Sequence, residues 1–127
     1  AFRGEPLPVH GDGTQSRDFT YVSTVVEVIT DALRRRVDHL EPVNLAFGTN
    51  VSLLEVIGHL EGILGRPLYR EHLPSRVGDV SRSQADSSTL LGLFPDVRPT
   101  PLVEGLEATV RWFETARPWQ RLSPGTG

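Results

Sequence analysis

Residues 51–67 read VSLLEVIGHLEGILGRP and contain the signals for both ends of a helix. Ser52 and Glu55 form a capping box, in which each side chain accepts a hydrogen bond from the backbone amide of the other residue. Gly65 followed by Pro67 is a typical helix end, because glycine adopts the left-handed C-cap conformation and proline cannot continue the helix. The pattern predicts a helix between Ser52 and Gly65. Its apolar face consists of Leu53, Val56, Ile57, Leu60 and Leu64.

Short apolar runs lie on both sides of this helix. Residues 43–47 predict a short buried strand, and residues 48–50 form the loop that leaves it. After the helix, residues 67–73 allow another strand. The polar stretch that follows, residues 74–83, has no hydrophobic periodicity, so we expect a loop there.

A helix is also predicted upstream of residue 43. From Val22 onward, apolar residues recur with the period of an amphipathic helix. Thr24 and Glu27 match a second capping box, and we expect the helix to run from about Val25 to Arg36. The apolar positions on which this prediction rests are 22, 25, 26, 29 and 33.

Two further helices are predicted towards the C-terminus. Asp86 can cap a short helix that runs through Leu91 and stops at Gly92. Thr100 with Pro101 opens the last helix, since proline is favoured in the first helical turn. The residues of this last helix expected to face inward are Leu102, Leu106, Val110 and Phe113.

Strands that alternate with helices indicate an α/β fold. A chain of 127 residues fits one domain, which we assign to residues 1–116, with residues 117–127 as a flexible tail. The predicted strands are too few and too short for a complete doubly wound sheet. We therefore expect few short strands with three main helices, forming part of a larger fold.

The composition excludes several classes of function. The chain has no cysteine, so nothing indicates an oxidising compartment, and the cytoplasm is the expected location. No apolar stretch approaches the roughly 20 residues that span a bilayer, and no membrane partner is expected. The net charge of -3 argues against nucleic acid as a partner. All 13 basic residues are arginine, which excludes any mechanism that needs a lysine amine.

Residues 4–22 read GEPLPVHGDGTQSRDFTYV. The apolar run 7–9 and the glycines at 11 and 13 predict an extended segment that ends in a turn. This stretch resembles the extended short-chain dehydrogenase/reductase family, the NAD-dependent nucleotide-sugar epimerases and dehydratases. Further similar segments follow in the family's order, so that the resemblance covers nearly the whole chain. They are residues 44–52, 76–80, 85–86, 91–92 and 104–106.

The resemblance implies a site for a nucleotide diphosphate-sugar. The arginine that matches Arg17, which lies in the same stretch as Gln15, contacts the substrate's phosphates in the family. In the family, the residues that match Arg76 and Asp79 contact a phosphate and the ribose hydroxyls. His10 stands where many relatives have an aromatic ring that stacks on the nucleobase. Without the resemblance, each has a structural alternative: a surface ion pair for Arg17, a solvated loop around Arg76, and a strand end in water for His10.

The sequence departs from the family pattern in two places. Relatives usually carry aspartate after the Tyr-Val pair, where this chain has Ser23 and Thr24; we expect threonine to keep the capping function. The strand that ends at residue 48 has Ala46 where glycine is typical.

The catalytic parts of the family have no counterpart in the sequence. No Gly-x-Gly-x-x-Gly turn follows a strand, and neither Tyr21 nor Tyr69 precedes a lysine. We therefore expect no catalytic residue, no cofactor and no metal site in this chain. It is expected to be a fragment, a split subunit or an isolated domain of a 4-epimerase or 4,6-dehydratase, inactive alone, whose missing N-terminal Rossmann domain binds NAD. The alternative is a stand-alone binding or interaction module that has lost its ligand.

Overall fold

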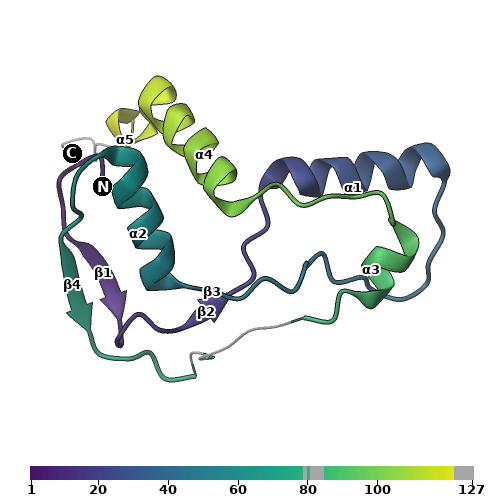
Figure 1. Cartoon of the computed structure of the whole chain (residues 1–127), viewed down its shortest axis with the longest axis horizontal. Helices are drawn as coiled ribbons and strands as arrows, with labels where there is room; N and C mark the ends of the chain where they lie inside the picture. The colour runs from purple at the N-terminus through teal and green to yellow at the C-terminus, as the bar shows by residue number, and fades with distance from the viewer. Residues whose placement is uncertain (79, 81–84, 122–127) are drawn as a thin grey trace, which may run out of the picture.

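The computed structural model describes residues 1–78, 80 and 85–121. Its elements in chain order are β1 (Leu7–His10), β2 (Ser16–Arg17), α1 (Val22–Arg35), β3 (Val51–Ser52), α2 (Leu53–Leu64), β4 (Arg70–Leu73), α3 (Ser88–Leu93), α4 (Leu102–Ala116) and α5 (Pro118–Arg121). This is the α/β arrangement of few short strands and three long helices that the sequence predicts. In Figure 1, β1, β4, α2 and α4 form one half of the molecule, α1 and α3 form the other, and β2 and β3 lie between them.

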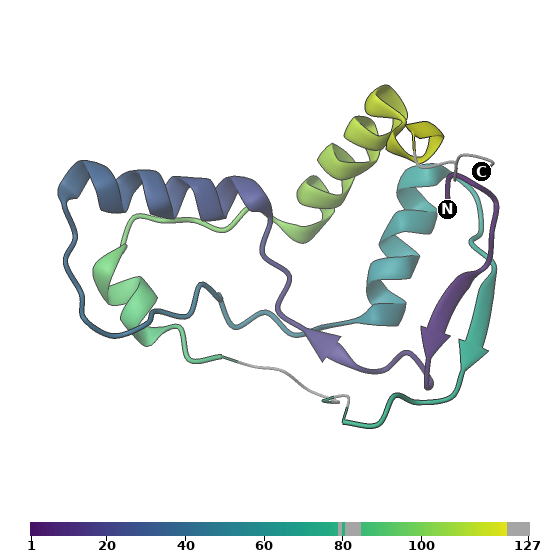
Figure 2. The ribbon, with the colours of Figure 1, turned by 180° about the vertical axis from the view of Figure 1, so that it is seen from behind.

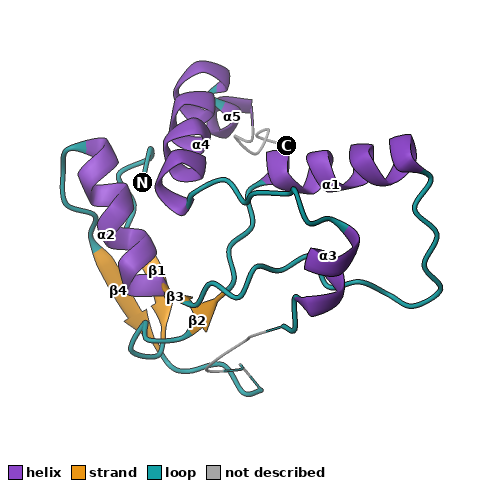
Figure 3. Cartoon of the chain, turned by 45° about the vertical axis from the view of Figure 1, so that its right-hand side comes forward, coloured by secondary structure: helices purple, strands orange, loops and turns teal. Residues whose placement is uncertain are grey.

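The first half is built on a parallel pair of strands. β1 and β4 pair with Val9 opposite His72, and α2 packs beside them (Figure 3). Val9, Ile57 and Leu68 form the buried centre of this half. The strand predicted within residues 67–73 is confirmed as β4, although its regular part starts only at Arg70.

The helix predicted between Ser52 and Gly65 is confirmed at both ends. Ser52 Oγ accepts from the backbone amide of Glu55 at 3.2 Å, and Glu55 Oε2 accepts from the backbone amide and the hydroxyl of Ser52 at 2.8 and 2.6 Å. The hydroxyl and the amide of Ser52 lower the pKa of the Glu55 carboxyl, because both bonds favour the charged form. Gly65 has φ of 63° and ends the helix.

The capping box predicted at Thr24 is wrong. α1 begins at Val22, three residues earlier than expected, and Thr24 lies inside its first turn with no exposed surface. The Thr24 hydroxyl accepts from the backbone amide of Thr100 at 3.0 Å and bonds the Thr100 hydroxyl at 3.2 Å, and Ser23 Oγ reaches that hydroxyl at 3.0 Å. These hydroxyl groups join the start of α1 to the segment that leads into α4.

The outward face of α1 is apolar. The exposed fractions of Val22, Val26, Ile29 and Leu33 are 62, 56, 53 and 74%. The predicted period is correct, but most of the residues that define it do not reach the core. The helix instead buries Val28 and packs Ala32 inward, because only one side of its wide apolar surface meets the described remainder of the chain.

The second half has a core of its own, and the strand predicted at residues 43–47 is not formed there. Val28, Leu90 and Phe94 are its buried centre. Val43, Leu45 and Phe47 pack against this centre, yet no strand in the described part of the chain pairs with their backbone. The apolar pattern therefore predicts the packing correctly but not the hydrogen-bonded ladder, which requires a neighbouring strand.

The C-terminal helices follow the predictions with shifted ends. Asp86 Oδ1 accepts from the backbone amide of Ser88 at 2.9 Å, and α3 includes Gly92 rather than stopping at it. α4 begins directly after Pro101 and buries Val110. α5 lies in the segment predicted to be a tail, and residues 122–127 lie outside the described residues. No helix in the described part is long and apolar enough to cross a membrane.

Replacing Ser52 with alanine should destabilise the protein by about 1 kcal/mol, since the N-terminal amides of α2 lose their side-chain acceptor. Ser87→Ala is the matched control, because Ser87 precedes α3 without a side-chain capping bond. Denaturant titration measures both free energies of unfolding. Equal losses in the two variants would contradict the role given to the capping box.

Gly13→Ala should destabilise by more than Gly48→Ala. Both glycines have positive φ, 81° and 75°, so each alanine carries a backbone cost of about 1–2 kcal/mol. A Cβ at Gly13 would also lie 2.8 Å from Leu54 Cδ2, whereas one at Gly48 would meet no atom within 4 Å. Thermal unfolding of both variants isolates this steric contribution, and identical midpoints would refute it.

Candidate functional site

The candidate site begins at the carboxyl end of β1. Gly11 and Gly13, both with positive φ, turn the chain there as predicted. Because Gly13 has no Cβ, the turn lies directly on Leu54 and Val9. The turn leads into β2 and not into a helix, so it lacks the helix N-terminus that a dinucleotide-binding turn provides.

Two histidines join this turn to the loop that follows β4. His10 Nδ1 lies 3.1 Å from the carbonyl of Pro74, and His72 Nδ1 lies 2.9 Å from the carbonyl of Gly11. Since a carbonyl only accepts, both Nδ1 atoms donate. Gln15 Nε2 donates to the carbonyl of His10 at 3.0 Å. The turn and the loop are thereby tied together at the edge where β1 and β4 end.

β2 contributes Arg17. It pairs antiparallel with β3, with Arg17 opposite Val51. Arg17 Nη1 donates to the carbonyl of Ser16 at 2.8 Å and to that of Val80 at 2.6 Å. The side chain is therefore half-buried and reaches across to the segment that follows Arg76.

Two adjoining cavities occupy this region. The first, about 270 Å³, is lined by Pro8, His10, Gln15, Arg17, Phe19, Leu53 and Arg76. The second, about 520 Å³, is lined by His10, Gly11, Asp12, Thr14, Gln15, Ser75 and Arg76. Four of the five residues predicted for the site thus line one cavity, and three of them line both. Asp79, the fifth, lies outside the described residues.

The charges of the two cavities differ. Among the described residues that line the first cavity, the charged side chains are the guanidinium groups of Arg17 and Arg76. The second includes Asp12, whose Oδ1 accepts from the hydroxyl and the backbone amide of Thr14 at 2.7 and 2.9 Å. These two bonds lower the pKa of the Asp12 carboxyl and favour its charged form. An anion is therefore favoured in the first cavity, and hydroxyl donors are favoured in the second.

Sequence reasoning did not identify the role of Asp18. Its carboxylate accepts three hydrogen bonds from residues 47–49. Tyr21 lies against Gly105, where an added Cβ would be 3.1 Å from the ring. The only signal for Asp18 in the sequence is its position directly after Arg17.

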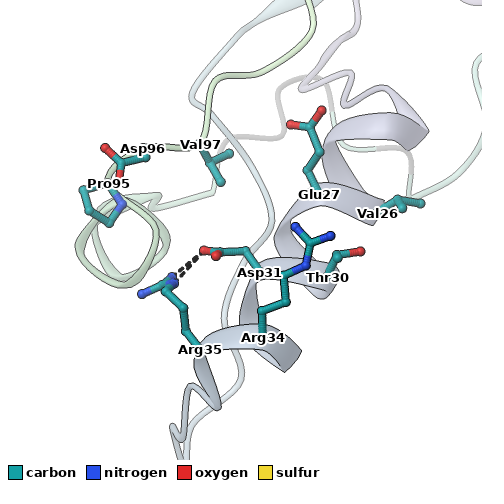
Figure 4. Close-up of a pocket in the computed structure, with 9 residues that line it drawn as sticks. All are labelled: Val26, Glu27, Thr30, Asp31, Arg34, Arg35, Pro95, Asp96 and Val97. Carbon is teal, nitrogen blue, oxygen red and sulfur yellow. Dashed lines mark hydrogen bonds and ion pairs between the residues drawn. The ribbon is translucent and has the colours of Figure 1, made fainter.

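A separate cavity of about 480 Å³ lies between α1 and residues 95–97 (Figure 4). Asp31 and Arg35 form an ion pair on its wall, and Arg35 also donates to the carbonyl of Leu93 at 2.8 Å. The Arg35 guanidinium carbon lies 5.1 Å from the Phe94 ring centroid. Arg35 therefore anchors α1 to α3, whereas Arg34 is exposed. In Figure 2, α1 lies at the opposite end of the molecule from β1 and β4.

The described residues contain no group of three or more histidine, aspartate or glutamate side chains that could hold a metal ion.

Comparison with known proteins connects the site to a family. The model of the NAD dependent epimerase/dehydratase family matches residues 1–46. A UDP-glucuronate 4-epimerase from Thermodesulfobacterium geofontis is 34% identical over 115 residues, which cover 87% of this chain and 34% of the relative. A dTDP-4-dehydro-6-deoxy-D-allose reductase from Streptomyces sp is 37% identical over 111 residues, covering 87% and 33%.

The fold is similar to solved structures as well. The UDP-glucuronic acid 4-epimerase from Bacillus cereus, in complex with UDP-glucuronic acid and NAD, matches with a TM-score of 0.81 at 32% identity, over 91% of this chain and 37% of that one. The chain spans about a third of the length of the curated relatives it matches. Sequence and fold agree, and the chain belongs to the NAD-dependent epimerase/dehydratase family of extended short-chain dehydrogenases/reductases.

Proposed function

We propose that this chain is the C-terminal, nucleotide-sugar-binding portion of an NAD-dependent sugar 4-epimerase or 4,6-dehydratase. The observation that carries the proposal is the shared cavity of Arg17 and Arg76, which come from segments far apart in the sequence. A guanidinium is always charged and presents a planar fork of donors that matches phosphate oxygens. Two such groups in the lining of one cavity suit a diphosphate.

The second cavity extends the same ligand. A nucleotide sugar carries hydroxyl-rich rings on both sides of its diphosphate. The Asp12 carboxylate and the hydroxyls of Thr14 and Ser75 line the adjoining space, and carboxylates accept hydrogen bonds from such rings. His10 and Gln15 line both cavities, so each can contact the ligand where its charged and neutral parts meet. In this proposal Asp79 adds a contact to the ribose.

NAD belongs to the remainder of the parent enzyme in this proposal. The turn at residues 11–13 lacks the following helix that holds a dinucleotide pyrophosphate. The sequence contains no lysine, so this chain does not contribute the tyrosine and lysine pair of the family. Its residues would bind and orient the sugar nucleotide, and the hydride-transfer chemistry that NAD supplies would take place on the other lobe.

Titration of the isotope-labelled chain with UDP and with UDP-glucuronate should shift the amide signals of Gln15, Arg17 and Arg76. We expect dissociation constants of about millimolar or weaker, because an incomplete pocket encloses little of the ligand. Arg17→Ala and Arg76→Ala should each weaken binding by about tenfold. Uridine, which lacks the diphosphate, should bind equally to all three proteins.

Arg98→Ala is the matched control for loss of a guanidinium, because Arg98 bonds the carbonyls of Pro95 and Val97 away from both cavities. A flat response of the unmodified chain to both nucleotides would reject the proposed function. It would favour the stand-alone module instead.

A further inference from the structure

The Asp18 carboxylate holds the chain at residues 47–49 through both of its oxygens. Oδ2 accepts from the backbone amides of Phe47 and Gly48, each at 2.8 Å. Oδ1 accepts from Thr49 Oγ1 at 2.6 Å. Three short bonds from consecutive residues to one carboxylate are charge-assisted and fix its position strongly. We call these three bonds the Asp18 clasp.

The clasp lies immediately beside Arg17. β2 and β3 pair over only two residues each, so the sheet alone restrains the backbone of Arg17 weakly, while its guanidinium donates to the carbonyls of Ser16 and Val80. In an extended chain, successive side chains point to opposite sides. Asp18 therefore binds residues 47–49 on one side of the strand while Arg17 lines the cavity on the other.

The clasp also connects the cavity to the second core. Phe47, which donates one of the three bonds, packs its side chain against the cluster of Val28, Leu90 and Phe94. The segment between Phe47 and β3 is short, so that fixing residues 47–49 also fixes the partner strand of Arg17. Through these contacts the core of α1 and α3 is connected to the strand that carries Arg17.

We propose that Asp18 is a positioning residue for ligand binding: through its clasp it aims Arg17 into the cavity, without contacting the ligand itself. The effect of Asp18 on ligand affinity rests on the proposed function. Its effect on the arginine in the ligand-free protein is independent of that function.

Asp18→Asn is the test, because it keeps the shape of the side chain but removes the negative charge that strengthens the clasp and leaves only one oxygen to accept from residues 47–49. In the ligand-free protein, the Arg17 Nε–H signal should shift or broaden together with the amide signal of Gly48, while the signals of Val9 and Ile57 stay in place. Thr49→Val, which removes one bond of the clasp, should give a smaller change in the same signals. Asp38→Asn is the control for charge, since Asp38 is exposed.

Affinity for UDP should fall about tenfold in Asp18→Asn and should not fall further when Asp18→Asn is added to Arg17→Ala, since the two residues act as one unit. Uridine binding should not change. If the Arg17 signal is unmoved in folded Asp18→Asn protein, or if the two substitutions weaken UDP binding additively, the positioning role is wrong even though the binding function stands. Failure of the unmodified chain to bind UDP rejects the proposed function alone, and the Arg17 signal still decides the positioning role.

Discussion

The parallel pairing of β1 with β4 is the constraint on which the candidate site depends. Parallel strands end at the same edge of a sheet, so the segments that leave His10 and Leu73 start side by side. One segment carries Gln15 and Arg17, and the other carries Arg76. Residues far apart in sequence thus line one cavity. The reciprocal bonds from the two histidines to backbone carbonyls keep the two segments together beyond the last strand residue.

Burial of α2 against this strand pair stabilises the arrangement. Val9 and Ile57 are almost fully buried, with exposed fractions of 0 and 3%, and burial of such side chains contributes about 1.5–3 kcal/mol each. The Gly13 turn packs on Leu54 in the first turn of α2. The position of β2, which follows this turn, is therefore restrained by α2. Glu61, on the last turns of α2, accepts from the backbone amide of Leu68 and from Arg70. The helix is therefore tied to β4 as well as to the turn.

Local signals in the sequence predict the elements whose causes are local. The capping box at Ser52, the C-cap at Gly65 and the glycine turn are all where the sequence predicts them, since each needs only neighbouring residues. The strand predicted at residues 43–47 and the cap predicted at Thr24 fail because a distant partner decides both. A ladder needs another strand, and the Thr24 hydroxyl bonds Thr100 instead of its own helix.

The site follows the same division. Composition and spacing alone do not predict that Arg17 and Arg76 line one cavity. The family resemblance identifies both residues, and the pairing of β1 with β4 explains why they line the same cavity. The role of Asp18 was not predicted because its three partners lie about thirty residues away. No local pattern distinguishes a carboxylate that holds a loop from one that faces water.

The two separate cores have a consequence for cooperativity. Their buried centres share no residue, and the hydrogen bonds of the Thr24 hydroxyl and of the Asp18 carboxylate are among the contacts that join them. Local opening of α1 and α3 therefore need not disrupt the pairing of β1 with β4. The backbone amide hydrogens of the two halves can exchange with solvent through openings of different free energy. Such local openings differ between the two halves and are not reported by the free energy of unfolding of the whole chain.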